Sequence, residues 1–134
     1  MKTGSFKIGC ATVAGSLCAL LLFWYFCRPV VVIHCSAVGS SPVGYVYDTD
    51  VYLARRTLRP GESAKYYTDW HHESDYWTSV SLPAEGGDSV EIIGPFSRLD
   101  VYIGPDARIE RTERRHGFFV RFTEPSPQIE KGLP

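Results

Sequence analysis

The sequence lacks the short motifs by which many enzymes can be recognised. It contains no phosphate-cradling glycine loop, no dinucleotide-binding fingerprint and no nucleophile elbow around a serine. Serine, histidine and aspartate are all present, but no pattern in the sequence sets them up for catalysis. The stretches between the expected strands are also short for a protein that would have to build an active site on loops. We therefore expect a non-catalytic protein that needs no cofactor.

The chain after Cys27 contains a single cysteine, and the chain as a whole has no excess of basic over acidic residues. Cys35 is the only thiol that follows Cys27, so no disulfide can form within the remainder. We expect Cys35 to be a small buried residue, although in an oxidising compartment it could pair with Cys27 or with a partner chain. The chain has 14 basic and 15 acidic residues. Because nucleic-acid binding requires a concentrated basic face, nucleic acid is not an expected partner.

One stretch contains no charge at all, and it divides the chain in two. Residues 8–27 read IGCATVAGSLCALLLFWYFC. A helix of about 20 residues that rises about 1.5 Å per residue spans roughly 30 Å, the thickness of the hydrocarbon core of a bilayer. The aromatic residues at its end, followed by Arg28 and Pro29, are typical of a helix that stops in the headgroup layer. We therefore expect a transmembrane helix that holds the protein in a lipid bilayer through residues 8–27.

A cleaved signal peptide is the alternative interpretation of this run, and it would leave a secreted β-domain. The run is longer than the apolar centre of about 7–15 residues that signal peptides carry, so we favour an uncleaved signal anchor. Lys2 and Lys7 precede the run, whereas Arg28 follows it. The positive-inside tendency then places residues 1–7 in the cytoplasm and the C-terminal domain in the periplasm or outside the cell.

Beyond the anchor, the sequence predicts short β-strands and turns without helical periodicity. β-branched residues and alternation of apolar with polar residues predict strands at 30–35, 63–68, 76–82, 89–93, 98–103, 108–114 and 118–123. Residues 45–57 fit either one long strand or a tight hairpin. In the last pair, residues 108–114 and 118–123 are expected to form a hairpin, with Phe118, Val120 and Phe122 on its buried side.

The clearest turn lies at residues 58–62, which read LRPGE. Pro60 presets φ near -65°, and Gly61 accepts the positive φ that a type II turn needs at the next position. The sequence therefore predicts that two strands meet at this turn.

The strand count and the turn spacing define the fold class. Seven to nine short strands with turns every eight to twelve residues are typical of an all-β soluble domain, an antiparallel β-sandwich of immunoglobulin-like type or a small barrel. The expected organisation is a leader at 1–7, the transmembrane helix at 8–27, a membrane-proximal strand and linker at 28–44, the β-sandwich at 45–124 with a possible start at 30, and a C-terminal tail at 125–134.

The densest group of metal-ligand residue types follows the strand at 63–68. It consists of Asp69, His71, His72 and Glu73, and imidazole with carboxylate suits zinc, copper or nickel. Adjacent histidines in an extended segment point to opposite sides, so at most one of His71 and His72 would join a carboxylate. A solvated loop is the interpretation that we favour, and the metal-binding or sensor domain is the alternative.

Aromatic residues are abundant in the same part of the chain. The candidates for a partner-binding surface are Tyr66, Tyr67, Trp70, Tyr76 and Trp77. Such side chains bury a large area at a small cost in conformational entropy, which makes them frequent at protein interfaces. With one anchor and no catalytic motif, the sequence predicts a single-pass membrane protein whose β-domain binds another protein, as an accessory subunit of a membrane or envelope complex.

Overall fold

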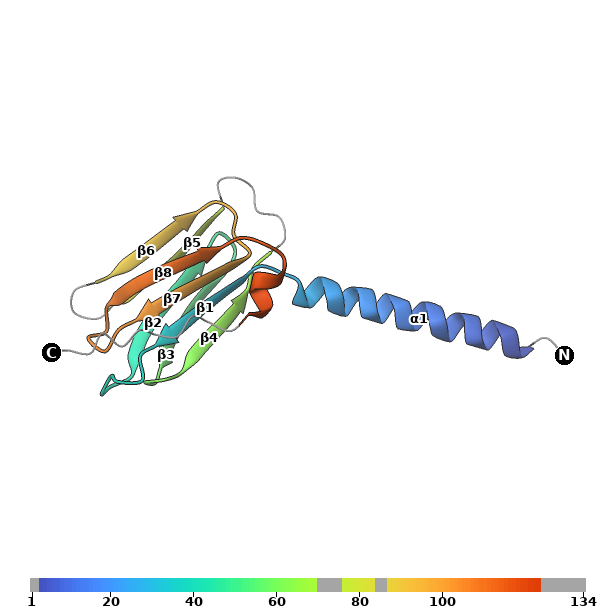
Figure 1. Cartoon of the computed structure of the whole chain (residues 1–134), viewed down its shortest axis with the longest axis horizontal. Helices are drawn as coiled ribbons and strands as arrows, with labels where there is room; N and C mark the ends of the chain where they lie inside the picture. The colour runs from blue at the N-terminus through green and yellow to red at the C-terminus, as the bar shows by residue number, and fades with distance from the viewer. Residues whose placement is uncertain (1–2, 70–75, 84–86, 124–134) are drawn as a thin grey trace.

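The computed structural model describes residues 3–69, 76–83 and 87–123, with side chains from Gly9 onward (Figure 1). The described residues form one long helix, eight strands and a final short 3-10 helix. They are α1 (Thr3–Phe26), β1 (Val30–Cys35), β2 (Val43–Thr49), β3 (Leu53–Leu58), β4 (Ser63–Tyr67), β5 (Trp77–Ser81), β6 (Ser89–Ile93), β7 (Arg98–Ile103), β8 (Ile109–Arg115) and η1 (Phe119–Phe122). The expectation of a mostly β chain with one apolar N-terminal helix is confirmed.

Helix α1 extends away from the strands as a separate rod (Figure 1). Its segment Gly9–Phe26 is long and apolar enough to cross a membrane, and no residue of this segment is buried, although its last turn touches the domain. The helix ends where Cys27 N–H donates to the Phe23 carbonyl at 2.9 Å, because Pro29 has no N–H with which to continue the ladder. The predicted helix is present, and its insertion into a membrane stays a prediction.

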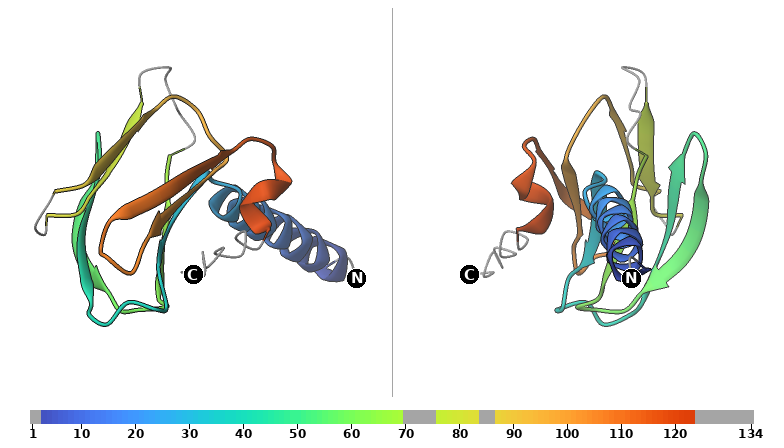
Figure 2. Two further views of the ribbon diagram at one scale, coloured as in Figure 1. Left: turned by 60° about the vertical axis from the view of Figure 1, so that its left-hand side comes forward. Right: turned by 90° about the vertical axis from the view of Figure 1, so that its right-hand side faces the viewer.

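The strands form two four-stranded sheets, which lie as two layers (Figure 2). One sheet has the order β4-β1-β7-β8 and the other has the order β3-β2-β5-β6. Strands β1 and β7 pair in parallel, with Val30 opposite Arg98 and Cys35 opposite Ile103. The expectation of a wholly antiparallel arrangement is wrong for this pair. A parallel pair needs a long crossover connection, and the chain supplies one because all five strands from β2 to β6 lie between β1 and β7 in the sequence.

The two layers enclose one hydrophobic core. Its members come from both sheets, and the largest are Tyr45, Tyr47, Leu58, Phe96, Ile33, Leu82, Ile92, Leu99 and Ile103. Strand β2 shows the expected alternation, with Val43, Tyr45 and Tyr47 buried and their neighbours half-buried. Strands β1 and β7 are instead buried at every residue, because they lie in the middle of their sheet and their outer face is also covered.

The turns hold the strands in this order. Residues 45–57 contain the hairpin β2–β3, in which the backbones of Thr49 and Tyr52 are hydrogen bonded to each other. At the predicted type II turn, Gly61 has φ +81° and Glu62 N–H donates to the Arg59 carbonyl at 3.0 Å. This turn joins β3 to β4 and so passes from one sheet to the other.

The final hairpin was predicted wrongly. Residues 118–123 do not form a strand against β8, because Gly117 has φ +116° and turns the chain away, and Phe118 then adopts a helical conformation that leads into η1. Phe118 and Phe122, which the sequence assigned to the core, are exposed. The apolar alternation at 118–122 therefore serves a surface next to α1.

Candidate functional site

The end of the two sheets from which α1 emerges carries a cleft. We call this the helix-proximal end, and the opposite end the distal end. The start of β1 joins the end of β4 there, because Thr68 N–H donates to the Pro29 carbonyl at 2.9 Å. Strand β7 also starts there, since Val30 N–H donates to the Ser97 carbonyl at 3.1 Å.

The cleft has a volume of about 500 Å³ and opens between the edge strands β4 and β3. We call it the tyrosine cleft, because six tyrosines line it. The lining residues come from three parts of the fold. They are Tyr25 in the last turn of α1 and Arg28 just after it, Tyr47, Thr49, Val51, Tyr52 and Arg56 from the β2–β3 hairpin with its turn, Lys65, Tyr66, Tyr67, Thr68 and Asp69 from β4 and the residues after it, and Tyr76 before β5. Helix, hairpin and sheet edge thus all contribute to one cavity.

Stacked tyrosine rings form the inner wall of the tyrosine cleft. The rings of Tyr47 and Tyr66 lie 4.3 Å apart and nearly parallel, and the ring of Tyr52 lies 6.3 Å from that of Tyr66. Tyr45 adds a hydrogen bond of 2.5 Å between its hydroxyl and that of Tyr66. Because Tyr45 and Tyr47 belong to β2 whereas Tyr66 belongs to β4, this cluster joins the two sheets at their open edge.

Burial shifts the pKa of two of these phenols, Tyr47 and Tyr45. It raises the pKa of Tyr47, and nearby tyrosines add to the rise. Burial also raises the pKa of Tyr45, and the hydrogen bond to Tyr66 acts in the same direction. Tyr45 and Tyr47 are therefore neutral throughout the physiological pH range and offer their hydroxyl groups as donors and acceptors.

Cations lie around the tyrosine wall. Lys65 Nζ lies 5.1 Å from the centre of the Tyr67 ring, and the Arg28 guanidinium lies 5.1 Å from that of Tyr25. Arg56 also lines the cavity and is exposed. Within the described residues, Arg28 Nε has no hydrogen-bond partner. Among the described lining residues, three cations stand against the single carboxylate of Asp69, which makes this part of the cleft suited to an acidic group.

The structure collects some of the residues that the sequence suggested and separates others. Tyr66, Tyr67 and Tyr76 line the tyrosine cleft together. Trp77 is the neighbour of Tyr76 in the chain, but its side chain is half-buried on the alternate face of β5 from the core residue Val80. Trp70 lies outside the described residues. Partner binding by these residues stays a prediction.

The suggested metal ligands are only partly described. Asp69 lines the tyrosine cleft and is exposed, whereas His71, His72 and Glu73 lie outside the described residues. Among the residues whose positions are described, no group of three His, Cys, Asp or Glu side chains is arranged to hold a metal ion.

A second polar constellation lies on the outer face of β4, β1 and β7. Asp100 is fully buried, and its Oδ1 accepts a hydrogen bond from His34 Nε2 at 2.8 Å. The Arg98 guanidinium donates to both carboxylate oxygens, at 2.7 and 2.8 Å, and also to the Thr123 carbonyl. His34 Nδ1 and Ser63 Oγ are hydrogen bonded at 2.9 Å. We call Ser63, His34, Asp100, Arg98 and the Thr123 carbonyl the Asp100 network.

Electrostatics keep the Asp100 carboxylate ionised. Burial raises its pKa, but the hydrogen bonds from His34 and Arg98 outweigh that effect, and the pKa lies below its usual value. The order serine, histidine, aspartate is the one used in nucleophilic catalysis. Here the paired guanidinium already neutralises the carboxylate, which weakens the support that it could give to a protonated His34.

Sequence reasoning missed the Asp100 network, although a signal was present. Arg98 and Asp100 are two residues apart, so they share one face of a strand whose other face carries Leu99 and Val101. Opposite charges beside each other on a strand that is apolar on its other face indicate a paired, covered surface. His34 and Ser63 could not be added from sequence, because their place depends on the register of β1 with β4 and β7.

Comparisons of the chain with known protein families, with curated proteins and with solved structures found no match.

Proposed function

We propose that the protein is a single-pass membrane protein whose β-sandwich domain binds another protein through the tyrosine cleft. In this proposal α1 is an uncleaved signal anchor, its N-terminus lies in the cytoplasm, and the domain lies in the periplasm or outside the cell. The role is non-catalytic, as an accessory subunit of a membrane or envelope complex.

The anchor is supported by the burial pattern of α1. A core helix of a soluble protein buries an apolar stripe, but the segment Gly9–Phe26 exposes apolar side chains on all sides. Leu17, Leu20, Leu21 and Leu22 are each more than half exposed. A bilayer is the environment in which such a surface is stable.

The sandwich is supported by the strand pairing. Within the described residues each strand pairs only inside its own sheet, so β4 and β3 remain unpaired at one edge and β8 and β6 at the other. A closed barrel would require pairing between these edges. Two layers around one core favour the sandwich over the small barrel.

The tyrosine cleft is the observation that carries the binding role. Protein interfaces are enriched in tyrosine and arginine, and their strongest contacts lie in pockets that take one or two side chains of the partner. The cleft combines stacked tyrosines with Arg28, Arg56 and Lys65 around a cavity of about 500 Å³. We therefore expect the partner to insert a segment that carries an aspartate, a glutamate or a terminal carboxylate.

Photo-crosslinking in intact membranes tests this role. The crosslinking amino acid p-benzoylphenylalanine replaces Tyr52, which is 48% exposed at the mouth of the cleft. The matched control carries it in place of Trp77, a half-buried aromatic residue in β5 of the same sheet, which does not line the cleft. We expect one discrete protein adduct from position 52 and none from position 77. Recovery of the uncrosslinked chain alone from position 52 would contradict the proposal.

Charge reversal tests whether the crosslinked adduct depends on the charge of the cleft or on nonspecific association. Arg56→Glu should abolish the adduct from position 52, because it repels an acidic segment. Arg108→Glu changes the same charge at the distal turn between β7 and β8, and it should leave the adduct unchanged.

A further inference from the structure

Three phenylalanines are exposed beside the end of α1. Phe119 is 77% exposed, and Phe118 and Phe122 are also exposed. We call these three residues the phenylalanine patch. The ring of Phe118 lies 5.3 Å from that of Phe119 and 6.2 Å from that of Phe122, so the three form one apolar surface. Exposing such a surface to water is unfavourable, and contiguous patches of this kind mark contact sites.

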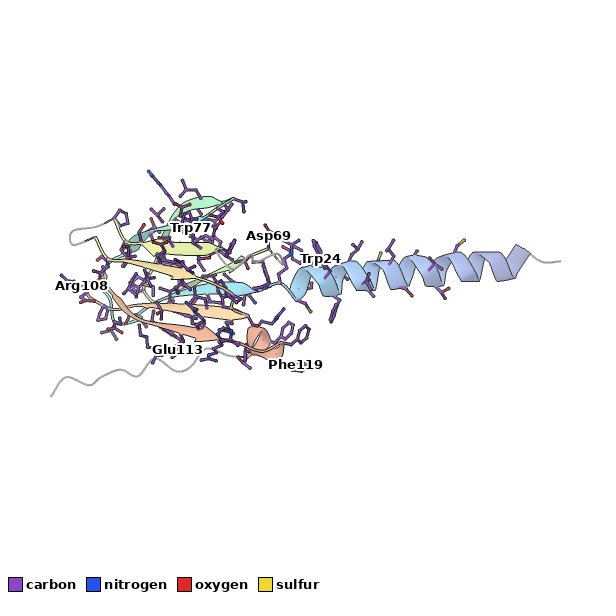
Figure 3. The ribbon with its side chains drawn as sticks, turned by 90° about the horizontal axis from the view of Figure 1, so that it is seen from above. Trp24, Asp69, Trp77, Arg108, Glu113 and Phe119 are labelled. Atoms are coloured by element: carbon purple, nitrogen blue, oxygen red, sulfur yellow. The ribbon has the colours of Figure 1, made fainter. Side chains whose placement is uncertain are left out.

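The position of the patch relative to α1 indicates what covers it. The rings of Phe118 and Phe23 are stacked, with their centres 6.0 Å apart. Phe23 lies three residues before the end of α1 at Phe26, which is about 4.5 Å along the helix axis at 1.5 Å per residue. The patch therefore reaches the level of the last turn of α1, beyond the end of the sheets. Figure 3 shows Phe119 at the same end of the domain as Trp24, with Arg108 at the opposite end.

The residues around the patch have the chemistry of a membrane interface. The Arg28 guanidinium lies 4.5 Å from the centre of the Trp24 ring, and aromatic residues with an adjacent cation mark the level at which a spanning helix leaves the lipid. The Arg121 guanidinium lies 4.7 Å from the Phe118 ring, and Arg114 and His116 are exposed just before the patch. Aromatic side chains flanked by basic ones are the composition of segments that lie in the headgroup layer.

We propose that the phenylalanine patch inserts into the phospholipid bilayer that holds α1, as a second membrane contact of the protein. The inference rests on the proposed anchoring of α1. The patch would fix the tilt of the domain, because two contacts on different elements stop it from turning about the end of a single helix. It would also hold η1 beside the membrane. The residue after η1, Thr123, accepts a hydrogen bond from Arg98 through its carbonyl, which links η1 to the Asp100 network.

Lipid crosslinking of the full chain tests this proposal. The chain is reconstituted into vesicles of phosphatidylcholine with phosphatidylglycerol, with p-benzoylphenylalanine at one of three positions. Position 119 reports the patch, and position 20 reports the middle of α1. Position 38 is the matched control, because Val38 is a 63% exposed apolar residue at the distal end. After illumination, phospholipid adducts are detected by the mass added to the protein.

The expected result is lipid adducts at positions 20 and 119 and none at position 38. Lipid adducts at position 20 but not at position 119 would overturn the inference and leave the anchor intact. A protein adduct at position 119 in place of lipid would also overturn it, and would assign the patch to a second copy of the chain. Failure at position 20 would refute the proposed anchoring itself, and lipid adducts at all three positions would show that the contact is not specific to the patch.

A second measurement uses charge in place of a crosslinker. Phe119→Asp changes an exposed residue, so the fold should survive, and unchanged circular dichroism checks this. A carboxylate is unfavourable in lipid, so the patch of this variant should stay outside the bilayer. A crosslinker at position 122 in this variant should therefore lose most of its lipid adduct. Phe119→Leu keeps the apolar character and should retain it. Equal adducts in both variants would contradict insertion of the patch.

Discussion

Replacing Asp100 by asparagine should be the most damaging small change in the β-domain. Asparagine keeps the size of the side chain but removes its charge, and its amide nitrogen would face donors of Arg98 or His34. Arg98 is itself buried, so its charge would lose its counter-ion inside the protein. Breaking a buried ion pair by changing one partner typically costs about 3–5 kcal/mol, and we expect about 3 kcal/mol here because the shape is kept.

The expected loss is large compared with the stability of such a domain. A domain of about 100 residues is stable by roughly 5–15 kcal/mol, and each 1 kcal/mol shifts its unfolding midpoint by about 4–8 °C. Asp100→Asn should therefore lower the midpoint of the full chain in detergent by roughly 12–24 °C, measured by near-ultraviolet circular dichroism at pH 7. Asp50→Asn removes the same charge at an exposed position, and it should change the midpoint little.

The pH dependence gives an independent check of the same reasoning. The pKa of Asp100 is lower in the folded protein than in the unfolded chain, so the unfolded chain binds the proton more readily. The contribution of Asp100 is thus complete above the unfolded pKa of about 3.9 and is lost as the pH falls through the folded value. The difference between the wild type and Asp100→Asn should shrink in that acid range. A difference below about 1 kcal/mol at pH 7, or one that is the same at pH 3, would refute a buried ion pair.

The remaining predictions concern the turn, the tyrosine cluster and the orientation. Gly61→Ala should lower the free energy of unfolding in urea by about 1–2 kcal/mol, because φ is +81° at this position. The control is Gly44→Ala in β2, which has open space around it and should be neutral or slightly stabilising. Tyr66→Phe should cost about 1 kcal/mol by the same assay, because it removes the hydrogen bond to the buried Tyr45 hydroxyl; an unchanged value would argue against that bond. A reporter that works only outside the cytoplasm should be active when it is fused behind Pro134, and activity of a cytoplasm-dependent reporter there would reverse the orientation.

The β-strands were predictable where local pattern and burial agree. Residues 89–93 and 98–103 alternate or carry β-branched residues, and both form strands with the expected bounds. The turn at 58–62 was equally clear, since Pro60 and Gly61 each fix one dihedral angle. What the local pattern could not supply was the partner of each strand, because the parallel pairing of β1 with β7 depends on residues more than sixty positions apart.

The wrong hairpin at 118–123 shows where alternation misleads. Phe118, Val120 and Phe122 alternate with the period of a strand. The same sequence pattern is compatible with an exposed apolar surface, which is what the structure has here. The difference was set by Gly117, whose φ of +116° redirects the chain. The tyrosine cleft was anticipated only in part, because Tyr66, Tyr67 and Tyr76 lie close together in sequence, whereas Tyr25, Tyr47 and Tyr52 reach it through the fold.

The joint between α1 and the sheets limits what can reach the tyrosine cleft. Only Cys27, Arg28 and Pro29 separate α1 from β1, and β1 is a central strand bonded on both sides. Cys27 is buried, and the Tyr25 ring lies 5.6 Å from that of Tyr67 at the end of β4. The last turn of α1 is thus part of the cleft wall rather than a loose tether. On the proposed anchoring, a partner that enters the cleft must approach within a few residues of the bilayer, so it should itself be a membrane protein or carry a segment that lies against the membrane.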